Sequence, residues 1–204
     1  VDTGYFETFN KDNVFLIDLK EHPIQKITAN TLESDKTYEV DTLIMATGFD
    51  AITGALTNID ISGRGNVKLK DQWEGGAKSY LGIGITNFPT LFTVTGPGSP
   101  SVLSNMMPSI EQHVNWITDC IEWMMKNDKT VIESTKTAED DWMVLVNEIA
   151  DMTVFTDTKS WYNGSNIEEK AKSFLPFIGV PVYTEMLDEI VSENYKGFIF
   201  DKAN

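Results

Sequence analysis

Cysteine, histidine and long apolar runs are scarce in this sequence of 204 residues, which contains one cysteine and two histidines. The single cysteine, Cys120, cannot form an internal disulfide, and this usage fits a reducing cytoplasm. His22 and His113 have no cysteine or carboxylate at a metal-ligand spacing, so we expect structural roles for both and no metal site. No apolar run reaches the roughly 18 residues that a membrane helix needs. We therefore expect a cytoplasmic location without membrane contact.

Positive charge is also scarce. The 16 Lys and Arg residues face 31 Asp and Glu residues, which gives a formal net charge of -15. Such a chain repels phosphate backbones and anionic lipids, so nucleic acids and membrane surfaces are excluded as partners. The glycine-rich fingerprint GxGxxG is absent as well. This chain therefore carries no recognisable pyrophosphate-binding turn of its own.

The residues that are present predict an α+β fold, with a β-meander and core strands followed by helices. Apolar runs bounded by Pro, Asn and charged residues predict strands over 13–19, 23–30, 37–46 and 91–94, and a short strand is predicted over 131–134. Apolar residues at steps of three and four predict helices over 105–126, 135–152 and 182–194. Residues 51–80 are rich in Gly, Asn and Asp, and this composition favours long loops.

Two of the predicted strands end in glycine. VDTLIMATG ends at Gly48, and LFTVTGPG ends at Gly96 and Gly98. Ligands of open sheets bind beyond the carboxyl ends of strands, where a residue without Cβ lets the backbone approach them. The second ending leads into a helix whose N-terminus, with Ser104 or Asn105 as its cap, favours an anion or a polarised carbonyl. An ordinary loop before a helix is the alternative.

The acidic cluster AEDD, residues 138–141, has two interpretations. It could supply a pair of catalytic carboxylates, but a solvated first turn of a helix is favoured. Cys120 lies in a helical pattern and is interpreted as a packed thiol rather than a nucleophile. Neither feature therefore predicts a catalytic site.

Several segments, taken in chain order, resemble the C-terminal part of Baeyer–Villiger monooxygenases of the cyclohexanone and phenylacetone type. They are DTGYFETFN-KDNV, DTLIMATGFDA, SYLGIGITNFPTLFTVTGPGSPSVLSNM, PSIEQHVNWI and SWYNGSN. The resemblance implies a flavoprotein fold with two dinucleotide-binding domains. It places 1–204 in the C-terminal portion of the FAD-binding domain, with 1–40 near the junction to the NADPH domain.

The resemblance implies that such an enzyme uses FAD, NADPH and molecular oxygen to convert ketones to esters or lactones through a flavin peroxide. It places Ala46, Thr47 and Gly48 near the cofactors. The helix that begins near Asn105 would point toward the flavin, and Met106 would touch the ring.

Three further residues match the substrate-facing loop of the family, namely Ser101, Val102 and Leu103. Trp161 matches the tryptophan that reaches the nicotinamide cofactor, whereas a surface aromatic contact is its alternative interpretation. No catalytic residue of the family falls within this chain. The nucleotide fingerprints, the FxGxxxHxxxW sequence and the arginine that supports the peroxide are expected in a missing N-terminal part, so the chain alone is predicted to be inactive.

Two other functions stay open at this stage. A flavin-containing N- or S-monooxygenase shares the ATG-type motif, although PSIEQHVNWI and SWYNGSN match that class less well. A non-catalytic acidic binding module with the same fold segment is the alternative from another class. The sequence upstream of Val1 would separate the monooxygenase from the binding module, because two GxGxxG strands are expected there only if the chain is part of the enzyme.

Overall fold

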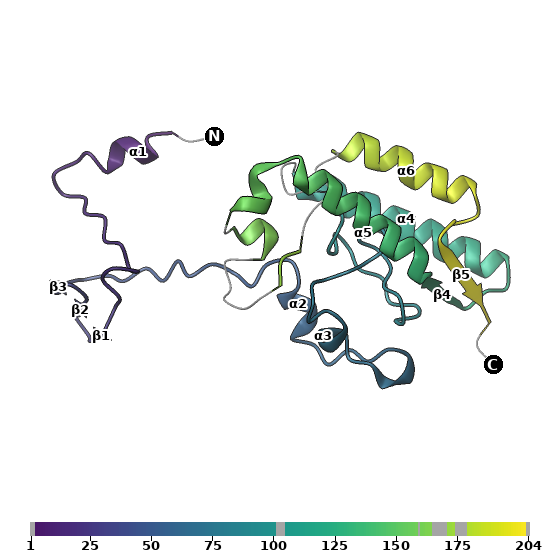
Figure 1. Ribbon diagram of the computed structural model, residues 1–204, viewed down its shortest axis with the longest axis horizontal. Helices are drawn as coiled ribbons and strands as arrows, with labels where there is room; N and C mark the ends of the chain where they lie inside the picture. Colours follow the sequence, from purple (N-terminus) through teal and green to yellow (C-terminus); the bar gives the residue numbers. More distant parts are fainter. Residues whose placement is uncertain (1–2, 101–104, 159, 165–170, 174–178, 203–204) are drawn as a thin grey trace. The chain divides into compact units, whose positions relative to one another are not determined.

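The computed structural model describes residues 3–100, 105–158, 160–164, 171–173 and 179–202. Contacts divide the chain into two compact units, Val1–Gly48 and Phe49–Asn204. Figure 1 shows the elements of both units in chain order. The predicted helices and most of the buried side chains belong to the second unit.

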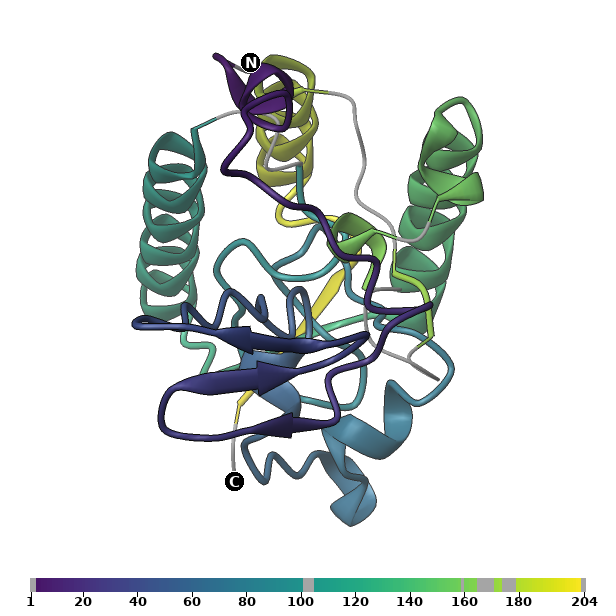
Figure 2. The ribbon, with the colours of Figure 1, turned by 90° about the vertical axis from the view of Figure 1, so that its left-hand side faces the viewer.

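The first unit contains a three-stranded antiparallel meander. A short helix α1 (Tyr5–Thr8) precedes β1 (Lys26–Ile27), β2 (Thr31–Glu33) and β3 (Thr37–Glu39), which lie in the order β1-β2-β3. Figure 2 shows these strands edge to edge. The meander confirms strands within 23–30 and 37–40. The polar stretch predicted to separate them instead supplies β2, because the tight turn between Thr28 and Thr31 brings its backbone into register with β1.

Two predicted strands of this unit are wrong. Residues 13–19 and 41–48 contain no strand, and their apolar side chains lie in solvent, with Phe15 77% and Ile44 82% exposed. An apolar stretch becomes a strand only when a neighbouring strand accepts and donates its backbone hydrogen bonds. The described residues of the first unit supply no such neighbour. The segment that contains Ala46, Thr47 and Gly48 is therefore extended and exposed rather than a buried strand.

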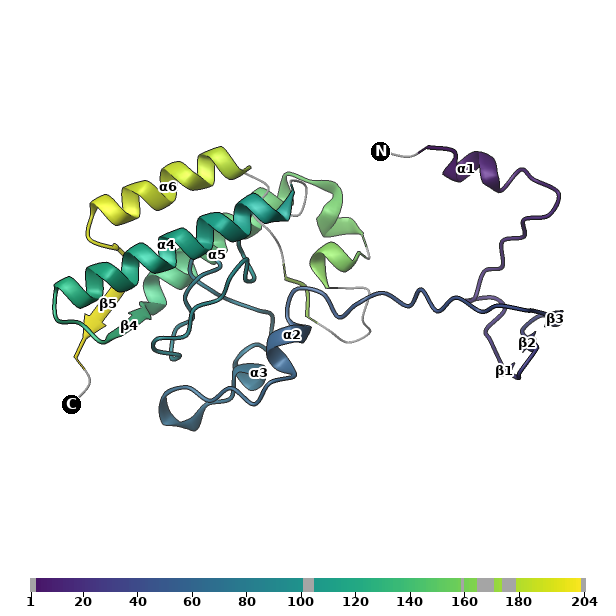
Figure 3. The ribbon, with the colours of Figure 1, turned by 180° about the vertical axis from the view of Figure 1, so that it is seen from behind.

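The second unit is built around three helices and a two-stranded sheet. The helices are α4 (Met106–Lys126), α5 (Lys136–Asp151) and α6 (Val180–Ser192), and β4 (Val131–Ser134) pairs antiparallel with β5 (Phe198–Asp201). Figure 3 shows α4 and α6 running side by side. Their facing sides enclose an apolar core. Its fully buried members include Leu81, Ile83, Cys120, Val146, Tyr183 and Leu187.

The three long helices confirm the predicted periodicity, with bounds within one or two residues. Asn105 caps α4 by accepting a hydrogen bond from the Met107 N–H at 3.0 Å. Thr135 caps α5 in the same way, by accepting from the Ala138 N–H at 3.2 Å. Pro181 lies in the first turn of α6, where its missing N–H costs little. Local sequence signals therefore determine where these helices begin.

Residues 49–100 are mostly turns around a second, smaller apolar cluster. They include α2 (Gly54–Thr57), the 3₁₀ helix η1 (Arg64–Asn66) and α3 (Leu69–Gln72). Leu69, Trp73, Ala77, Ile85 and Phe88 form the cluster. The long loops predicted over 51–80 are thus broadly confirmed.

The predicted strand over 91–94 is wrong. Phe92 forms only an isolated bridge with Gly84, and no ladder extends from it. The segment is nevertheless held in place, because the Thr93 N–H donates to the carbonyl of Ile83 at 2.9 Å. The mixed helix and strand content agrees with an α+β fold. β4 confirms the strand predicted over 131–134, and among the described residues of the second unit its sheet with β5 lies after α4 rather than before the helices.

Within the part of the chain that the structure describes, no helix is both long and apolar enough to span a bilayer. The same residues contain no cluster of three or more His, Cys, Asp or Glu side chains that could hold a metal ion. Cys120 is fully buried, and burial raises the pKa of its thiol to about 12. The interpretation of Cys120 as a packed thiol is confirmed.

Candidate functional site

The loop Thr95–Gly98, which leads toward α4, is fixed by side chains from distant parts of the second unit. The Ser79 hydroxyl donates to the Pro97 carbonyl at 2.5 Å, and the Trp142 indole N–H donates to the Gly98 carbonyl at 3.0 Å. On its N-terminal side, the Thr95 N–H donates to His113 Nδ1 at 3.0 Å. Ser79, Trp142 of α5 and His113 of α4 therefore hold this loop in place.

Glycine is required at two places around this loop. A Cβ on Gly96 would lie 2.4 Å from the Thr93 hydroxyl oxygen, and a Cβ on Gly82 would lie 2.4 Å from the Ser99 Cβ. Side chains do not approach one another so closely, so only glycine lets these two segments pack against each other. The glycine ending at Gly96 was predicted to allow close approach of a ligand. In the structure it allows close approach of the chain's own segments.

The N-terminus of α4 is the second part of the candidate site. The first turn carries no acidic residue, although the chain has a net charge of -15. Asn105 occupies the Met107 N–H, and Pro108 has no N–H, so Met106 is the first-turn residue whose N–H could face a bound group. A 21-residue helix with an uncompensated positive end favours an anion or a carbonyl oxygen there.

Trp161 lies in the 3₁₀ turn η3 (Trp161–Asn163), with 45% of its surface exposed. Its indole stacks on the Tyr162 ring with 4.2 Å between centroids and 25° between planes. Asn163 is buried and donates to the carbonyls of Phe155 and Thr158 at 2.8 and 3.1 Å. The Asn163 side chain thus holds the turn in place. The exposed part of the Trp161 indole could stack on a planar ring.

The other predicted residues lie in the first unit or outside the described residues. Ala46, Thr47 and Gly48 belong to the first unit, where Gly48 has a φ of 79° and open space around it. That left-handed conformation is one that glycine adopts without strain. Ser101, Val102 and Leu103 lie outside the described residues. The structure therefore brings together the Thr95–Gly98 loop and the helix that follows it.

Four anchoring residues of the site were not found from the sequence. Ser79, Trp142 and Tyr183 act through single hydroxyl or indole groups on partners 18 to 102 residues away. Glu139, predicted to lie in a solvated helix start, is instead buried and accepts from the Thr86 N–H at 2.9 Å. Burial raises the pKa of its carboxyl, and the Thr86 amide opposes this effect. No local pattern identifies such distant contacts.

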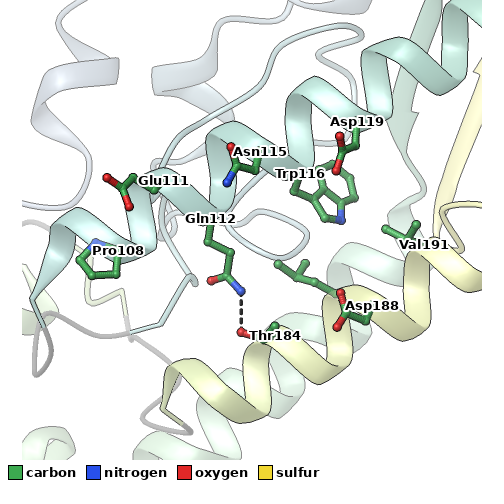
Figure 4. Close-up of a pocket in the computed structure, with 10 residues that line it drawn as sticks. Pro108, Glu111, Gln112, Asn115, Trp116, Asp119, Thr184, Asp188 and Val191 are labelled. Carbon is green, nitrogen blue, oxygen red and sulfur yellow. Dashed lines mark hydrogen bonds between the residues drawn. The ribbon is translucent and has the colours of Figure 1, made fainter.

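A separate groove of about 430 Å³ lies between α4 and α6 (Figure 4). Gln112 Nε2 donates to the Thr184 hydroxyl at 2.6 Å across it. Carboxylates of Glu111, Asp119 and Asp188 line the groove, and no basic residue does. Of the described residues of the second unit that were predicted to bind a cofactor, Asn105, Met106 and Trp161 do not line this groove.

No protein-family model matches the chain. Among curated proteins, cyclohexanone 1,2-monooxygenase from Acinetobacter sp. is 40% identical over 200 residues, which are 97% of this chain and 36% of that protein. Phenazine N-monooxygenase PhzNO1 from Lysobacter antibioticus is 39% identical over 96% of this chain and 36% of its own length. A Baeyer–Villiger monooxygenase from Pseudooceanicola batsensis is 39% identical over 98% of this chain and 37% of its own length.

Solved structures match equally well. Cyclohexanone monooxygenase from Rhodococcus sp. Phi1 bound to NADP+ superposes with a TM-score of 0.91 at 38% identity, over 99% of this chain and 38% of that one. The OTEMO complex with FAD and NADP superposes with a TM-score of 0.88 at 34% identity, over 98% of this chain and 37% of that one.

These likenesses define the class first: the fold is that of a segment of a flavin-dependent monooxygenase. The chain spans somewhat more than a third of the length of the curated relatives it matches. Within that class, the relatives that this chain matches are named as cyclohexanone and Baeyer–Villiger monooxygenases, and the chain is similar to the corresponding segment of these proteins.

Proposed function

We propose that this chain is the C-terminal part of a cytoplasmic, FAD- and NADPH-dependent Baeyer–Villiger monooxygenase. The complete protein converts ketones and molecular oxygen to esters or lactones. One observation carries the proposal: at 38–40% identity, almost the entire chain matches relatives named for this chemistry. The N-terminal part of the same polypeptide supplies the remaining half of the site.

For FAD, the N-terminus of α4 offers the best fit in this chain. When bound, FAD accepts electrons from NADPH and supplies the oxygen chemistry. The first turn of α4 has no carboxylate to repel a flavin that becomes more negative on reduction. Asn105 caps the turn by accepting from the Met107 N–H, and Met106, whose N–H is not used by this cap, would hold the flavin there. This end of the helix stabilises negative charge without moving during the reaction.

For NADPH, the exposed indole of Trp161 offers a flat apolar face. Its stacking on Tyr162 and the anchor at Asn163 hold that face in one orientation. Covering the cofactor with a fixed ring excludes water from the reacting centre. Trp161 therefore retains NADP in the closed enzyme.

The first unit contributes through its exposed apolar stretch. Leu43, Ile44 and Met45 are 39–82% exposed, and so much apolar surface on one short segment favours burial against another part of a protein. In the complete enzyme this stretch lies at the junction of the two dinucleotide-binding domains, with 1–40 close to the NADPH domain. Ala46, Thr47 and Gly48 then lie near the cofactors.

The substrate is recognised by Ser101, Val102 and Leu103. In the sequence they lie between the fixed loop Thr95–Gly98 and α4, the helix proposed to face the flavin. A short loop between two rigid supports can alter the shape of a pocket without disturbing the core.

The test uses the complete protein, purified with its flavin. NADPH oxidation is recorded with cyclohexanone, with an aryl ketone and with phenazine, and the products are identified by mass spectrometry. We expect the ketones to give esters or lactones. N-oxide formation from phenazine without any ester would favour the N-oxygenase alternative.

A further inference from the structure

His113 connects three elements of the second unit through its two ring nitrogens. It lies on α4 with none of its surface exposed. Its Nδ1 accepts from the Thr95 N–H at 3.0 Å, and its Nε2 lies 2.9 Å from the Tyr183 hydroxyl of α6. The Tyr183 hydroxyl also donates to the Leu81 carbonyl at 2.6 Å. One imidazole therefore joins the Thr95–Gly98 loop to two helices.

The direction of these hydrogen bonds follows from their partners. A backbone N–H can only donate, so His113 Nδ1 must be the unprotonated nitrogen. The Tyr183 proton goes to the Leu81 carbonyl, so the Tyr183 oxygen accepts from the Nε2–H of His113. The Thr95 N–H, the His113 Nε2–H and the Tyr183 hydroxyl then each donate one hydrogen bond to the next group. A neutral imidazole with its proton on Nε2 is the state that fits.

Thr95 is the residue of the loop where such an anchor matters most. It has a φ of 49°, a conformation that a β-branched residue adopts only when its surroundings hold it there. The anchors at Pro97 and Gly98 hold carbonyl groups, and His113 holds the N–H at the start of the loop. Loss of the His113 contact frees the strained end.

We propose that His113 is a positioning residue that sets ketone affinity by fixing Thr95, and with it the segment that leads into residues 101–103. This inference rests on the proposed function, because it concerns the substrate of the same site. His113 touches neither cofactor nor ketone in this account. It acts through the position of the backbone at Thr95.

Two variants of the complete protein separate positioning from packing. In His113→Asn, the side-chain oxygen replaces Nδ1 and still accepts from Thr95, whereas the contact with Tyr183 is lost. In His113→Gln, the longer side chain reaches the Nε2 position and keeps Tyr183, whereas the acceptor for Thr95 is lost. Each variant breaks one of two hydrogen bonds in the same core. A purely structural role predicts similar effects from both.

The measurements are the KM for cyclohexanone, kcat, the KM for NADPH and the hydrogen exchange of the Thr95 amide. Loss of one hydrogen bond corresponds to roughly a three- to tenfold change in an equilibrium. We expect His113→Gln to raise the KM for the ketone by about that factor and to speed exchange at Thr95. His113→Asn should stay near the wild type in both, and kcat and the KM for NADPH should change little in either variant.

Equal ketone KM values in the two variants, or equal exchange at Thr95, would overturn the proposal. A wild-type protein that oxidises no ketone would instead refute the proposed function. Even then, exchange at Thr95 decides whether His113 holds that amide. The two failures are therefore distinguishable.

Discussion

The indole N–H of Trp142 donates a hydrogen bond of 3.0 Å to the carbonyl of Gly98, across 44 residues of sequence. This contact joins α5 to the loop in front of α4, and both partners are buried. A buried carbonyl without a partner costs about 1–3 kcal/mol. The loop therefore depends on a tryptophan that is not itself among the residues proposed to bind cofactor or substrate.

Replacing Trp142 by Phe removes this donor and keeps most of the ring. We expect the free energy of unfolding to fall by about 1–3 kcal/mol, measured by urea denaturation. Trp123→Phe is the matched control, because Trp123 packs on Tyr195 and Phe200 and its indole makes no hydrogen bond among the described residues. Equal losses in the two variants would show that ring volume, and not the hydrogen bond, is what matters.

Gly96 offers a test of the close packing between the loop and its support. In Gly96→Ala, the new Cβ would meet the Thr93 hydroxyl and the Gly82 carbonyl at 2.4 and 2.7 Å. Forcing a methyl group into such a contact destabilises a core by about 1–3 kcal/mol. Gly75→Ala is the control, because a Cβ there meets open space. The thermal midpoint should drop for the first variant only; a drop of the same size for both contradicts this packing.

The buried His113 predicts a pH dependence of stability. Burial lowers its pKa from 6.5 to about 4, against a smaller opposing effect of the Thr93 backbone. The unfolded chain therefore binds a proton at a higher pH than the folded chain does. Stability is complete above pH about 6.5 and is lost as the pH falls toward about 4, by at most about 3 kcal/mol.

Other groups titrate in the same range, so the comparison is made with His113→Asn. Glu139, whose raised carboxyl pKa acts in the opposite direction, is common to both proteins. The difference between the two stability curves should grow from pH 4 to pH 7 in favour of the wild type. A difference that does not change with pH would mean that His113 is protonated, or unprotonated, equally in both states.

Trp161→Ala tests the proposed contact with NADP. Removing the exposed indole should weaken NADPH affinity or increase the hydrogen peroxide released per NADPH consumed, while the FAD content stays near normal. Tyr162→Leu is a useful companion, since it removes the ring on which Trp161 stacks and leaves the indole itself in place. If Trp161→Ala changes neither the NADPH affinity nor the hydrogen peroxide released per NADPH, Trp161 makes only a surface aromatic contact.

The sequence predicted the helices well because their signals are local. Apolar residues at steps of three and four, with Asn105 as one of two cap candidates for α4, define α4 and α5 within one or two residues. The strands were predicted poorly. The apolar composition of a run such as 41–47 indicates that it tends to be buried. It does not indicate whether a partner strand lies beside it. β5 was only an apolar ending in the sequence, and its pairing with β4 bridges 64 or more residues.

The sequence pointed only to those parts of the candidate site that lie within one continuous segment. The capped start of α4 is such a segment, and the Thr95–Gly98 loop is another. The anchors of that loop come from Ser79, Trp142 and the His113–Tyr183 pair, far apart in sequence. His113 was expected to be structural, and its burial agrees with that expectation. Its specific partners depend on tertiary packing, which no spacing in the sequence encodes.

The central claim is that this chain completes the active site of a ketone monooxygenase. The most direct measurement is the mass of the product formed by the complete protein from cyclohexanone, NADPH and oxygen labelled with ¹⁸O. Our account predicts a lactone that carries one labelled oxygen atom, with one NADPH consumed per lactone. NADPH consumption without labelled lactone, across cyclic and aryl ketones, would contradict it.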